Sequence, residues 1–343
     1  MKKTNSQKGY EEMKRITIYD VAKEADVSLA TVSRVINGSE VVREDTRVKV
    51  QEAIEKLGYK PNAIAQGLAL QKTTTIALVV PEASYFYTGQ IINGLIDVAK
   101  IYKYNLMLHT TTSGITEMND IIENIIKSRV DGVVIFNDKL NKEELNQLTK
   151  YQIPIVVIGN KMSDETIGSV YVDYSKLVYD YAMQCIKQGK KRLALVEDRK
   201  NPVMIKQLLD GLNRAYADNG MEFDGYLAIP KDFHSSYDFL KKYIQKGITY
   251  DVVITYRDSQ AMAVLNTAKE NGISVPEDME LVCILDSKYN SMARPQISGF
   301  KIPDYDLGAL AMRLLTKLLN EDTEVEDKEI ELSYVFTPRK STR

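Results

Sequence analysis

The hydrophobic residues near the start of the chain form two short helical patterns that meet at residues 26–28. The buried faces that these patterns predict contain small and branched side chains: Val21, Ala22 and Ala25 in the first, and Val32, Val35 and Ile36 in the second. Ser28 is a good N-cap for the second helix because its hydroxyl accepts a backbone N–H. Asp26 tolerates the positive φ that the turn requires. The pattern predicts a helix-turn-helix with residues 29–37 as its recognition helix.

The outward face of the second helix carries small or hydrogen-bonding side chains: Ala30, Thr31, Arg34 and Asn37. Such groups suit base edges and phosphates better than a solvent face held by salt bridges does. We therefore favour a DNA-binding unit over the alternative, an ordinary helical hairpin in a protein core.

A third amphipathic helix is predicted over Arg43–Leu57, ending at Gly58. Its predicted buried stripe is Val48, Val50, Ala53, Ile54 and Leu57. Three helices close a DNA-binding domain at 16–60, and 61–72 forms a hinge and linker. There Asn62 caps a helix too short to be stable without a partner. On composition alone, Leu68 is either packed linker or a wedge that opens a step of the minor groove.

From Thr75 the chain alternates between buried strands and amphipathic helices. The first series has strands at Ile76–Val80, Asn105–His109, Gly132–Phe136 and Ile155–Ile158, and helices at Tyr87–Tyr102, Ile115–Ser128 and Lys142–Tyr151. The second has strands at Ser169–Val172, Arg192–Val196, Tyr226–Ile229, Asp251–Thr255 and Glu280–Ile284, and helices at Lys176–Gln188, Val203–Asn219, Ser236–Lys246 and Ser259–Asn271. This order predicts an α/β body, 73–343, of two doubly wound parallel-sheet subdomains with a ligand cleft between them. A last helix, Tyr305–Leu319, must pack back on one of them, and Arg313 and Lys317 share one of its faces.

Charge and composition narrow the class of protein. The 343 residues carry a net charge of -2, with 12 Lys/Arg against 10 Asp/Glu in residues 1–62 and 33 against 37 beyond. A mildly basic head on an acidic body suits a protein that touches DNA at one end. The two cysteines predict a reduced, cytoplasmic compartment. Residues 1–15 lack the apolar core of a secretory signal and are expected to form a polar arm.

The residues needed for enzyme chemistry are sparse. His109 and His234 are the two histidines, and neither has a Cys or Glu arrangement typical of a catalytic triad or metal site. A phosphate-binding Gly-x-Gly loop is also missing from the sequence. We therefore expect no catalytic residues, no metal and no cofactor. The charged stretches Asn141–Lys150 and Asn320–Glu331 are expected to be solvated faces or loops.

Two segments closely resemble the lac/gal repressor family: Thr17–Ala22 with Ser28–Gly38, and Leu57–Ala65. The resemblance extends over essentially the whole chain. Within the family, residues 72–75, 101–105, 292–296 and 305–317 are most similar to the members that act in carbon catabolite control. The resemblance implies a homodimer, with a body like periplasmic binding proteins, that binds a pseudo-palindromic operator.

The resemblance also implies roles for residues that face DNA. Those at base-reading positions are Leu29, Ala30 and Arg34. Those at positions that touch phosphates or flank the bases are Thr17, Tyr19, Thr31, Ser33 and Asn37. Asn62 and Ala65 belong to the hinge, with Leu68 as its wedge. Gln66 replaces a common Arg, which should weaken phosphate attraction and flatten the salt dependence.

The cleft departs from that of sugar-responsive members. Asp258 matches a position of the polar ring there, but Leu285 replaces an Asp, with Asp286 beside it, and Leu208 replaces an Arg. A leucine cannot orient a sugar hydroxyl, which argues against release by a sugar. A small phosphosugar remains open as a modulator. The alternative function is a local operon repressor that answers to a small ligand in this cleft.

The resemblance implies serine-phosphorylated HPr as corepressor, docked on the helix near the end of the chain. The residues carried over to that face are Asp306, Ala309, Arg313, Leu314 and Lys317. Arg313 is the expected phosphoserine partner because a guanidinium binds phosphate through two donors. Residues 87–93 are expected to add contacts.

Overall fold

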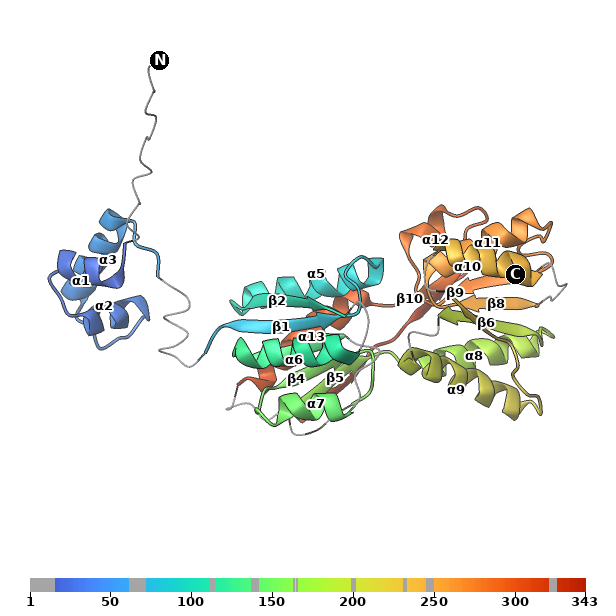
Figure 1. The fold of residues 1–343 in the computed structure, drawn as a ribbon, viewed down its shortest axis with the longest axis horizontal. Coiled ribbons are helices and arrows are strands. Elements are labelled where there is room, and N and C mark those ends of the chain that lie inside the picture. The colour runs from blue at the N-terminus through green and yellow to red at the C-terminus, as the bar shows by residue number, and fades with distance from the viewer. Residues whose placement is uncertain are drawn as a thin grey trace, which may run out of the picture. The chain divides into compact units, whose positions relative to one another are not determined.

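The computed structural model describes residues 16–61, 72–111, 115–136, 142–162, 164, 166–198, 202–230, 233–244, 250–320 and 326–343. The chain divides into two compact units, Met1–Thr73 and Thr74–Arg343 (Figure 1). The predicted hinge residues Asn62, Ala65, Gln66 and Leu68 lie outside the described residues, so their assigned roles stay predictions.

The smaller unit contains three helices, α1 (Ile18–Glu24), α2 (Leu29–Ile36) and α3 (Glu44–Leu57). Its core is built on Val21, Val32 and Val50, which are fully buried. Val48 was expected in the buried stripe but is 42% exposed, because α3 turns Val50 and Ala53 toward α1 and α2 instead. The three predicted helices are therefore present, with one residue of the stripe placed wrongly.

Lobe 1 of the larger unit is a six-stranded sheet in the order β11-β5-β4-β3-β1-β2. Its strands are β1 (Thr75–Val80), β2 (Asn105–Thr110), β3 (Gly132–Phe136), β4 (Ile155–Ile158), β5 (Ile167–Tyr171) and β11 (Glu329–Glu331). Helices α5 (Phe86–Ile101) and α13 (Asp304–Leu318) pack on one face. Helices α6 (Ile115–Lys127) and α7 (Lys142–Thr149) pack on the other.

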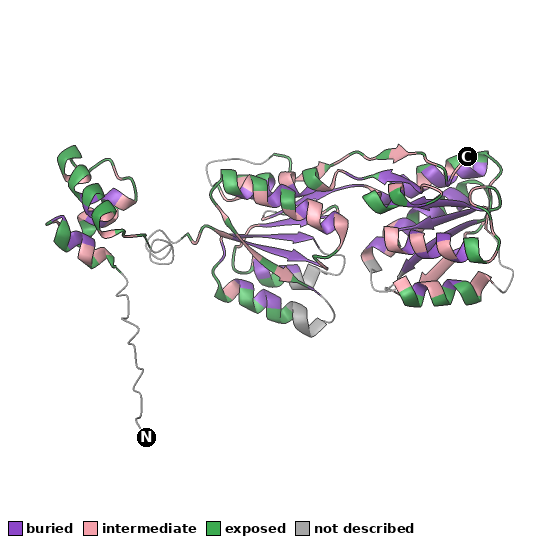
Figure 2. Cartoon of the chain, turned by 90° about the horizontal axis from the view of Figure 1, so that it is seen from above, coloured by how far each residue is buried: buried purple, intermediate pink, exposed green. Residues whose placement is uncertain are grey.

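Lobe 2 is a second six-stranded sheet in the order β12-β10-β9-β8-β6-β7. Its strands are β6 (Leu193–Asp198), β7 (Tyr226–Ile229), β8 (Val252–Thr255), β9 (Glu280–Cys283), β10 (Ser298–Lys301) and β12 (Val335–Thr337). Helices α8 (Tyr174–Lys187) and α9 (Pro202–Asp218) cover one face, and α10 (Phe233–Ile244) and α11 (Asp258–Glu270) cover the other. A short helix, α12 (Lys288–Met292), follows β9. In both lobes the buried residues concentrate on the sheet and on the inner helix faces (Figure 2).

The α/β class with two parallel sheets is confirmed, and three details of the prediction are corrected. The strand expected at Ser169–Val172 belongs to the sheet of lobe 1, not to the second series. Strands β10, β11 and β12 were not predicted, and β11 lies inside Asn320–Glu331, which was expected to be loop or solvated face. β12 pairs antiparallel with β10, although only parallel pairing was expected.

Helix α13 returns to lobe 1 and packs along α5 at two glycines. A Cβ on Gly94 would lie 2.0 Å from the backbone oxygen of Tyr305, and one on Gly308 would lie 2.0 Å from that of Ile91. The two helices therefore touch backbone to backbone. This contact fixes which face of α13 remains exposed.

Candidate DNA-binding surface and effector sites

The turn between α1 and α2 is built as the sequence predicts. Asp26 has φ 54°, and Val27 donates a backbone hydrogen bond to the Ala22 oxygen at 3.1 Å. The Ser28 hydroxyl accepts from the Thr31 backbone N–H at 3.2 Å. These bonds fix the angle at which the two helices cross, so the side chains on the outward face of α2 are held in one orientation relative to α1.

The outward face of α2 is open to solvent. Leu29 is 36% exposed, and Ala30, Arg34 and Asn37 are exposed as well. The Arg34 side chain has no hydrogen bond or ion pair within the part of the chain that the structure describes. Tyr19 on α1 is 67% exposed. Thr31 and Ser33 are half-buried at the edge of the same face.

Thr17 differs from the other predicted phosphate contacts because its donors are already used. Its backbone N–H and its hydroxyl both donate to Oδ2 of Asp20, at 2.8 and 2.7 Å. This pair closes the start of α1 as a cap. A phosphate would have to displace Asp20 to bind the Thr17 hydroxyl.

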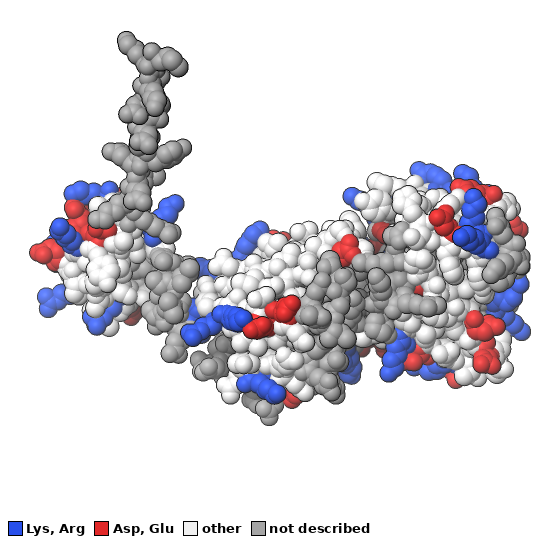
Figure 3. Space-filling model, viewed as in Figure 1, with Lys and Arg blue, Asp and Glu red and all other residues white. Residues whose placement is uncertain are grey.

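The charge of the small unit is balanced over the described residues. Residues 16–61 hold seven Lys/Arg and eight Asp/Glu, and both signs are interspersed over the visible face (Figure 3). The basic excess predicted for this end therefore comes from residues 1–15, which carry five basic and two acidic side chains. The described unit by itself therefore has no net positive charge to attract DNA.

The site between the lobes is built around Arg257, which sequence reasoning missed. Arg257 precedes α11 at the carboxyl end of β8 and is only 7% exposed. Its Nη1 donates to the Tyr85 hydroxyl of lobe 1 at 3.0 Å, and its guanidinium lies 5.2 Å from the centre of that ring. Its Nη2 donates to Oε1 of the fully buried Glu197 at 3.4 Å, and Gln260 donates to the same oxygen at 3.3 Å.

The two acids predicted for the cleft lie together beside Arg257, and both are engaged. Asp258 accepts a hydrogen bond from the Ser287 hydroxyl at 2.6 Å. Asp286 is held by both terminal nitrogens of Arg339, at 2.7 and 2.6 Å. The cavity that the two acids line, together with Tyr85 and Leu285, has a volume of only about 20 Å³. In this conformation the protein's own side chains leave little free space between these residues.

A signal for the missed residues exists in the sequence. Glu197 ends an otherwise apolar run, Leu193–Val196, at the carboxyl end of a strand. Arg257 takes the matching place directly before Asp258. Opposite charges at the carboxyl ends of two neighbouring strands predict a buried pair in the cleft. By contrast, Leu208 is fully buried in the apolar core that includes α8 and α9.

Helix α13 presents part of the predicted docking face. Asp306, Arg313 and Lys317 are exposed, and their side chains have no hydrogen bond or ion pair to a described residue. Leu314 is only 2% exposed, and its side chain packs closely against Gly168 of lobe 1. It is therefore not available as a docking contact, and that assignment was wrong. Ala309 is half-buried, with its backbone nitrogen beside Gly94 of α5.

Other reactive groups in the described residues are inert. Burial raises the pKa of the Cys185 thiol to about 11 and that of Cys283 to about 12, so both stay protonated at neutral pH. Burial also lowers the pKa of His109 on β2. Within the described ranges, no group of three or more His, Cys, Asp or Glu side chains is arranged to hold a metal. None of the described helices is long and apolar enough to cross a membrane.

A three-helix unit with a helix-turn-helix, joined to a two-lobed α/β body, defines a class of bacterial regulators. Residues 17–62 match the bacterial regulatory proteins of the lacI family, and residues 182–342 match the periplasmic binding protein-like domain. The chain belongs to the lacI family and is a DNA-binding regulator of transcription. It is not an enzyme, since its relatives are regulators.

Individual members of the family are similar to this chain over nearly its whole length. It is 37% identical to the HTH-type transcriptional regulator pepR1 of Lactobacillus delbrueckii subsp. lactis, over 95% of this chain and 98% of that protein. It is 34% identical to catabolite control protein A of Priestia megaterium, over 96% and 99%. The lac repressor dimer bound to operator and the anti-inducer ONPF shares the fold, with a TM-score of 0.84 at 23% identity over 96% and 99% of the two chains.

Proposed function

We propose that this protein is a dimeric repressor in carbon catabolite control, with serine-phosphorylated HPr as its corepressor on α13. The observation that carries the proposal is the exposed guanidinium of Arg313, which has no hydrogen bond or ion pair to any described residue and lies on the same face of α13 as Lys317. Arg313 lies seven positions, about two helical turns, after Asp306, so the three side chains share one side of the helix. A phosphoserine would meet two cations there, and Asp306 would meet a basic group of the partner.

The packing of α13 supports an effect of docking on the DNA-binding state. Because α13 touches α5 backbone to backbone at Gly94 and Gly308, a shift of α13 on docking would be passed to α5. Helix α13 is entered directly from β10 of lobe 2, so it joins the lobes as well. A partner that binds one arrangement of the lobes more tightly than another shifts the population toward it.

The composition of the cleft supports a protein corepressor over a small ligand. Asp258 and Asp286 already accept hydrogen bonds from Ser287 and Arg339, and Leu285 adds an apolar wall. A sugar would have to displace these partners and would find few free groups. The alternative, a local operon repressor with a ligand in the cleft, requires that cleft to rearrange.

A binding titration tests the proposal. Operator affinity is measured with the full-length chain by fluorescence anisotropy, alone, with serine-phosphorylated HPr and with unphosphorylated HPr. We expect only the phosphorylated form to tighten binding, by about fivefold or more, which is the range of ordinary allosteric coupling. Equal affinities in all three arms, with a response to a phosphosugar instead, would establish the alternative.

A further inference from the structure

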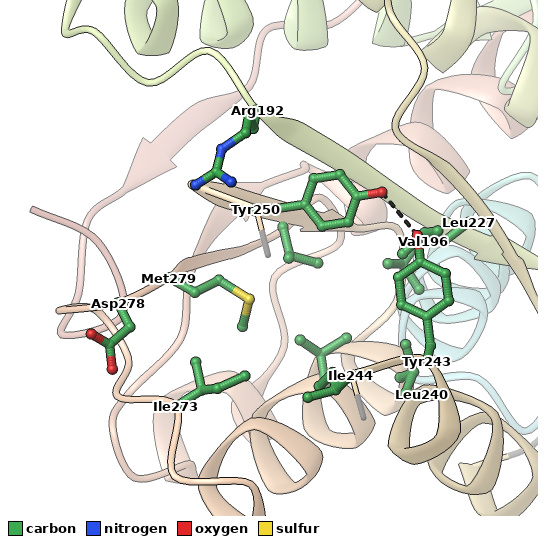
Figure 4. A pocket seen from close by; sticks show the side chains of 12 residues that line it. Arg192, Val196, Leu227, Leu240, Tyr243, Ile244, Tyr250, Ile273, Asp278 and Met279 are labelled. Atoms are coloured by element: carbon green, nitrogen blue, oxygen red, sulfur yellow. Dashed lines mark hydrogen bonds between the residues drawn. The ribbon is translucent and has the colours of Figure 1, made fainter. Parts of the chain in front are cut away.

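Lobe 2 contains a second cavity far from the carboxyl ends of its strands. It has a volume of about 370 Å³ and lies between the sheet and helices α10 and α11 (Figure 4). Arg192, Tyr250 and Met279 line it, and they come just before β6, β8 and β9. The cleft residue Asp258 follows β8, at the opposite edge of the sheet. The cavity is therefore separate from the site between the lobes.

The wall of this cavity is mostly apolar. Aliphatic and thioether side chains from the sheet and both helices form it: Val196, Leu227, Leu240, Val264, Ile273 and Met279. Its volume falls in the range of small-molecule sites and equals on the order of a dozen water molecules. Water gains little in such surroundings because it needs two to four polar partners. An apolar body of about ten non-hydrogen atoms suits the space better.

Among the described residues that line the cavity, two tyrosines add neutral polar groups to the apolar wall. The hydroxyls of Tyr243 and Tyr250 lie 3.0 Å apart and share one hydrogen bond (Figure 4). Two hydroxyls bring two protons, and this bond uses one of them, so the pair retains one O–H donor. Burial raises the pKa of Tyr250, which keeps its hydroxyl protonated at neutral pH. The pair therefore offers a ligand one hydrogen bond.

The charged groups at the edge of the cavity already have partners of their own. Arg192 is paired with Asp251 at 2.9 Å. Asp278 accepts the backbone N–H of Ser274 at 2.8 Å. Both charged side chains are therefore already held by contacts within the chain, so binding a neutral occupant would break neither contact. A neutral occupant fits these charges.

We propose that lobe 2 binds a neutral aromatic or branched aliphatic molecule with a single hydroxyl in this cavity. The hydroxyl bonds the Tyr243–Tyr250 pair, and the apolar body packs against Val264 and Met279. Val264 belongs to α11, whose first turn carries Asp258 at the cleft. The molecule would thus contact the middle of the same helix that begins at the interlobe site.

Binding of p-cresol and toluene to the full-length chain tests the proposal. The two probes have the same ring and methyl group and differ in the hydroxyl. We expect saturable binding of both by ligand-observed NMR and calorimetry, with p-cresol about fivefold tighter, the contribution of one hydrogen bond. Tyr250→Phe keeps the ring and should remove the preference for p-cresol. Tyr289→Phe, a change at a 49% exposed tyrosine outside the cavity, should leave the preference intact.

A second variant tests the location by volume. Val264→Phe fills the cavity and should abolish binding of both probes while operator binding shows that the protein is folded. If Val264→Phe fails to fold, the Tyr250→Phe result decides. Absence of saturable binding of either probe to the wild-type chain would overturn the proposal. The same conclusion follows if p-cresol binds Tyr250→Phe as tightly as it binds the wild type.

Discussion

Arg257 of lobe 2 donates a hydrogen bond to the Tyr85 hydroxyl of lobe 1 at 3.0 Å, and it binds the buried Glu197 through its other terminal nitrogen. One guanidinium thus joins the two lobes and neutralises a buried carboxylate. Arg257 and Tyr85 both line the small cavity between the lobes. This arrangement of the lobes is therefore stabilised by a contact within the chain.

Tyr85→Phe removes the hydrogen bond between the lobes but keeps the ring over which Arg257 lies. We expect a loss of about 1 kcal/mol in the free energy of unfolding, as for one intramolecular hydrogen bond. Arg257→Ala should cost more, about 3–5 kcal/mol, because Glu197 stays buried without the guanidinium. Urea midpoints of the two variants measure the difference. Tyr102→Phe, at a 46% exposed tyrosine, is the matched control, and an equal loss there would refute the assignment.

The contact of α5 with α13 gives a prediction about packing. A methyl group at Gly94 would meet backbone atoms of Tyr305 and Ala309 at 2.0 and 2.8 Å, so Gly94→Ala must push the helices apart. We expect a loss of about 1–3 kcal/mol, typical of overpacking. Gly89→Ala on the same helix meets nothing within 4 Å and should stabilise the protein by about 0.5–1 kcal/mol. Thermal melting of both variants checks the opposite signs.

Local physical chemistry explains what the sequence predicted well. The cap at Ser28 and the positive φ at Asp26 depend on residues within one turn of each other, and both are present in the structure. The longer buried strands were found from their runs of branched residues. Strands β11 and β12 have three residues each, too few to show a period, and so they were missed.

Long-range pairing explains what the sequence did not predict. Tyr85 lies 172 residues from Arg257, so no spacing rule connects these two residues. The pair of Arg257 with Glu197 has a signal in the charges at two strand ends, but using that signal requires knowing that β6 and β8 are neighbours. The periodicity of α13 showed that the helix is amphipathic, but not that it is covered by both α5 and the sheet. Leu314 was placed on the docking face by the family resemblance, which carries over positions and not their burial, and it is buried against lobe 1.

Asp304, the first residue of α13, should make the stability of the protein depend on pH. Burial raises the pKa of Asp304 to about 8, while an unfolded aspartate has a pKa of about 3.9. Between these values the folded state keeps a proton that the unfolded state has released, so stability should fall as pH rises from about 4 to 8. Asp304→Asn should flatten that part of the profile. Melting temperatures at pH 5 and pH 8 measure it, and Asp306→Asn on the exposed face should keep the wild-type slope.

The proposed response to the corepressor depends on the side chain of Arg313. Arg313→Ala should leave the affinity for operator alone unchanged and remove the tightening by serine-phosphorylated HPr. Arg313→Lys should restore part of it, because lysine keeps the charge but loses the two-donor grip on phosphate. Lys187→Ala, at an exposed cation on α8, serves as the control. A full response in Arg313→Ala would move the docking site elsewhere.

Substitution of Arg34 distinguishes a role in base recognition from a role in phosphate contact. On an operator selected in vitro, Arg34→Ala should weaken specific binding by about 1–3 kcal/mol and relax the choice of base at one position of each half-site. The exposed guanidinium, free of partners among the described residues, is available for the two acceptors of a guanine in the major groove. Lys49→Ala changes another exposed cation of the same unit and is the control. Anisotropy titrations on the operator and on scrambled DNA distinguish the outcomes: an equal loss on both sequences, together with a shallower salt dependence, would make Arg34 a phosphate contact instead.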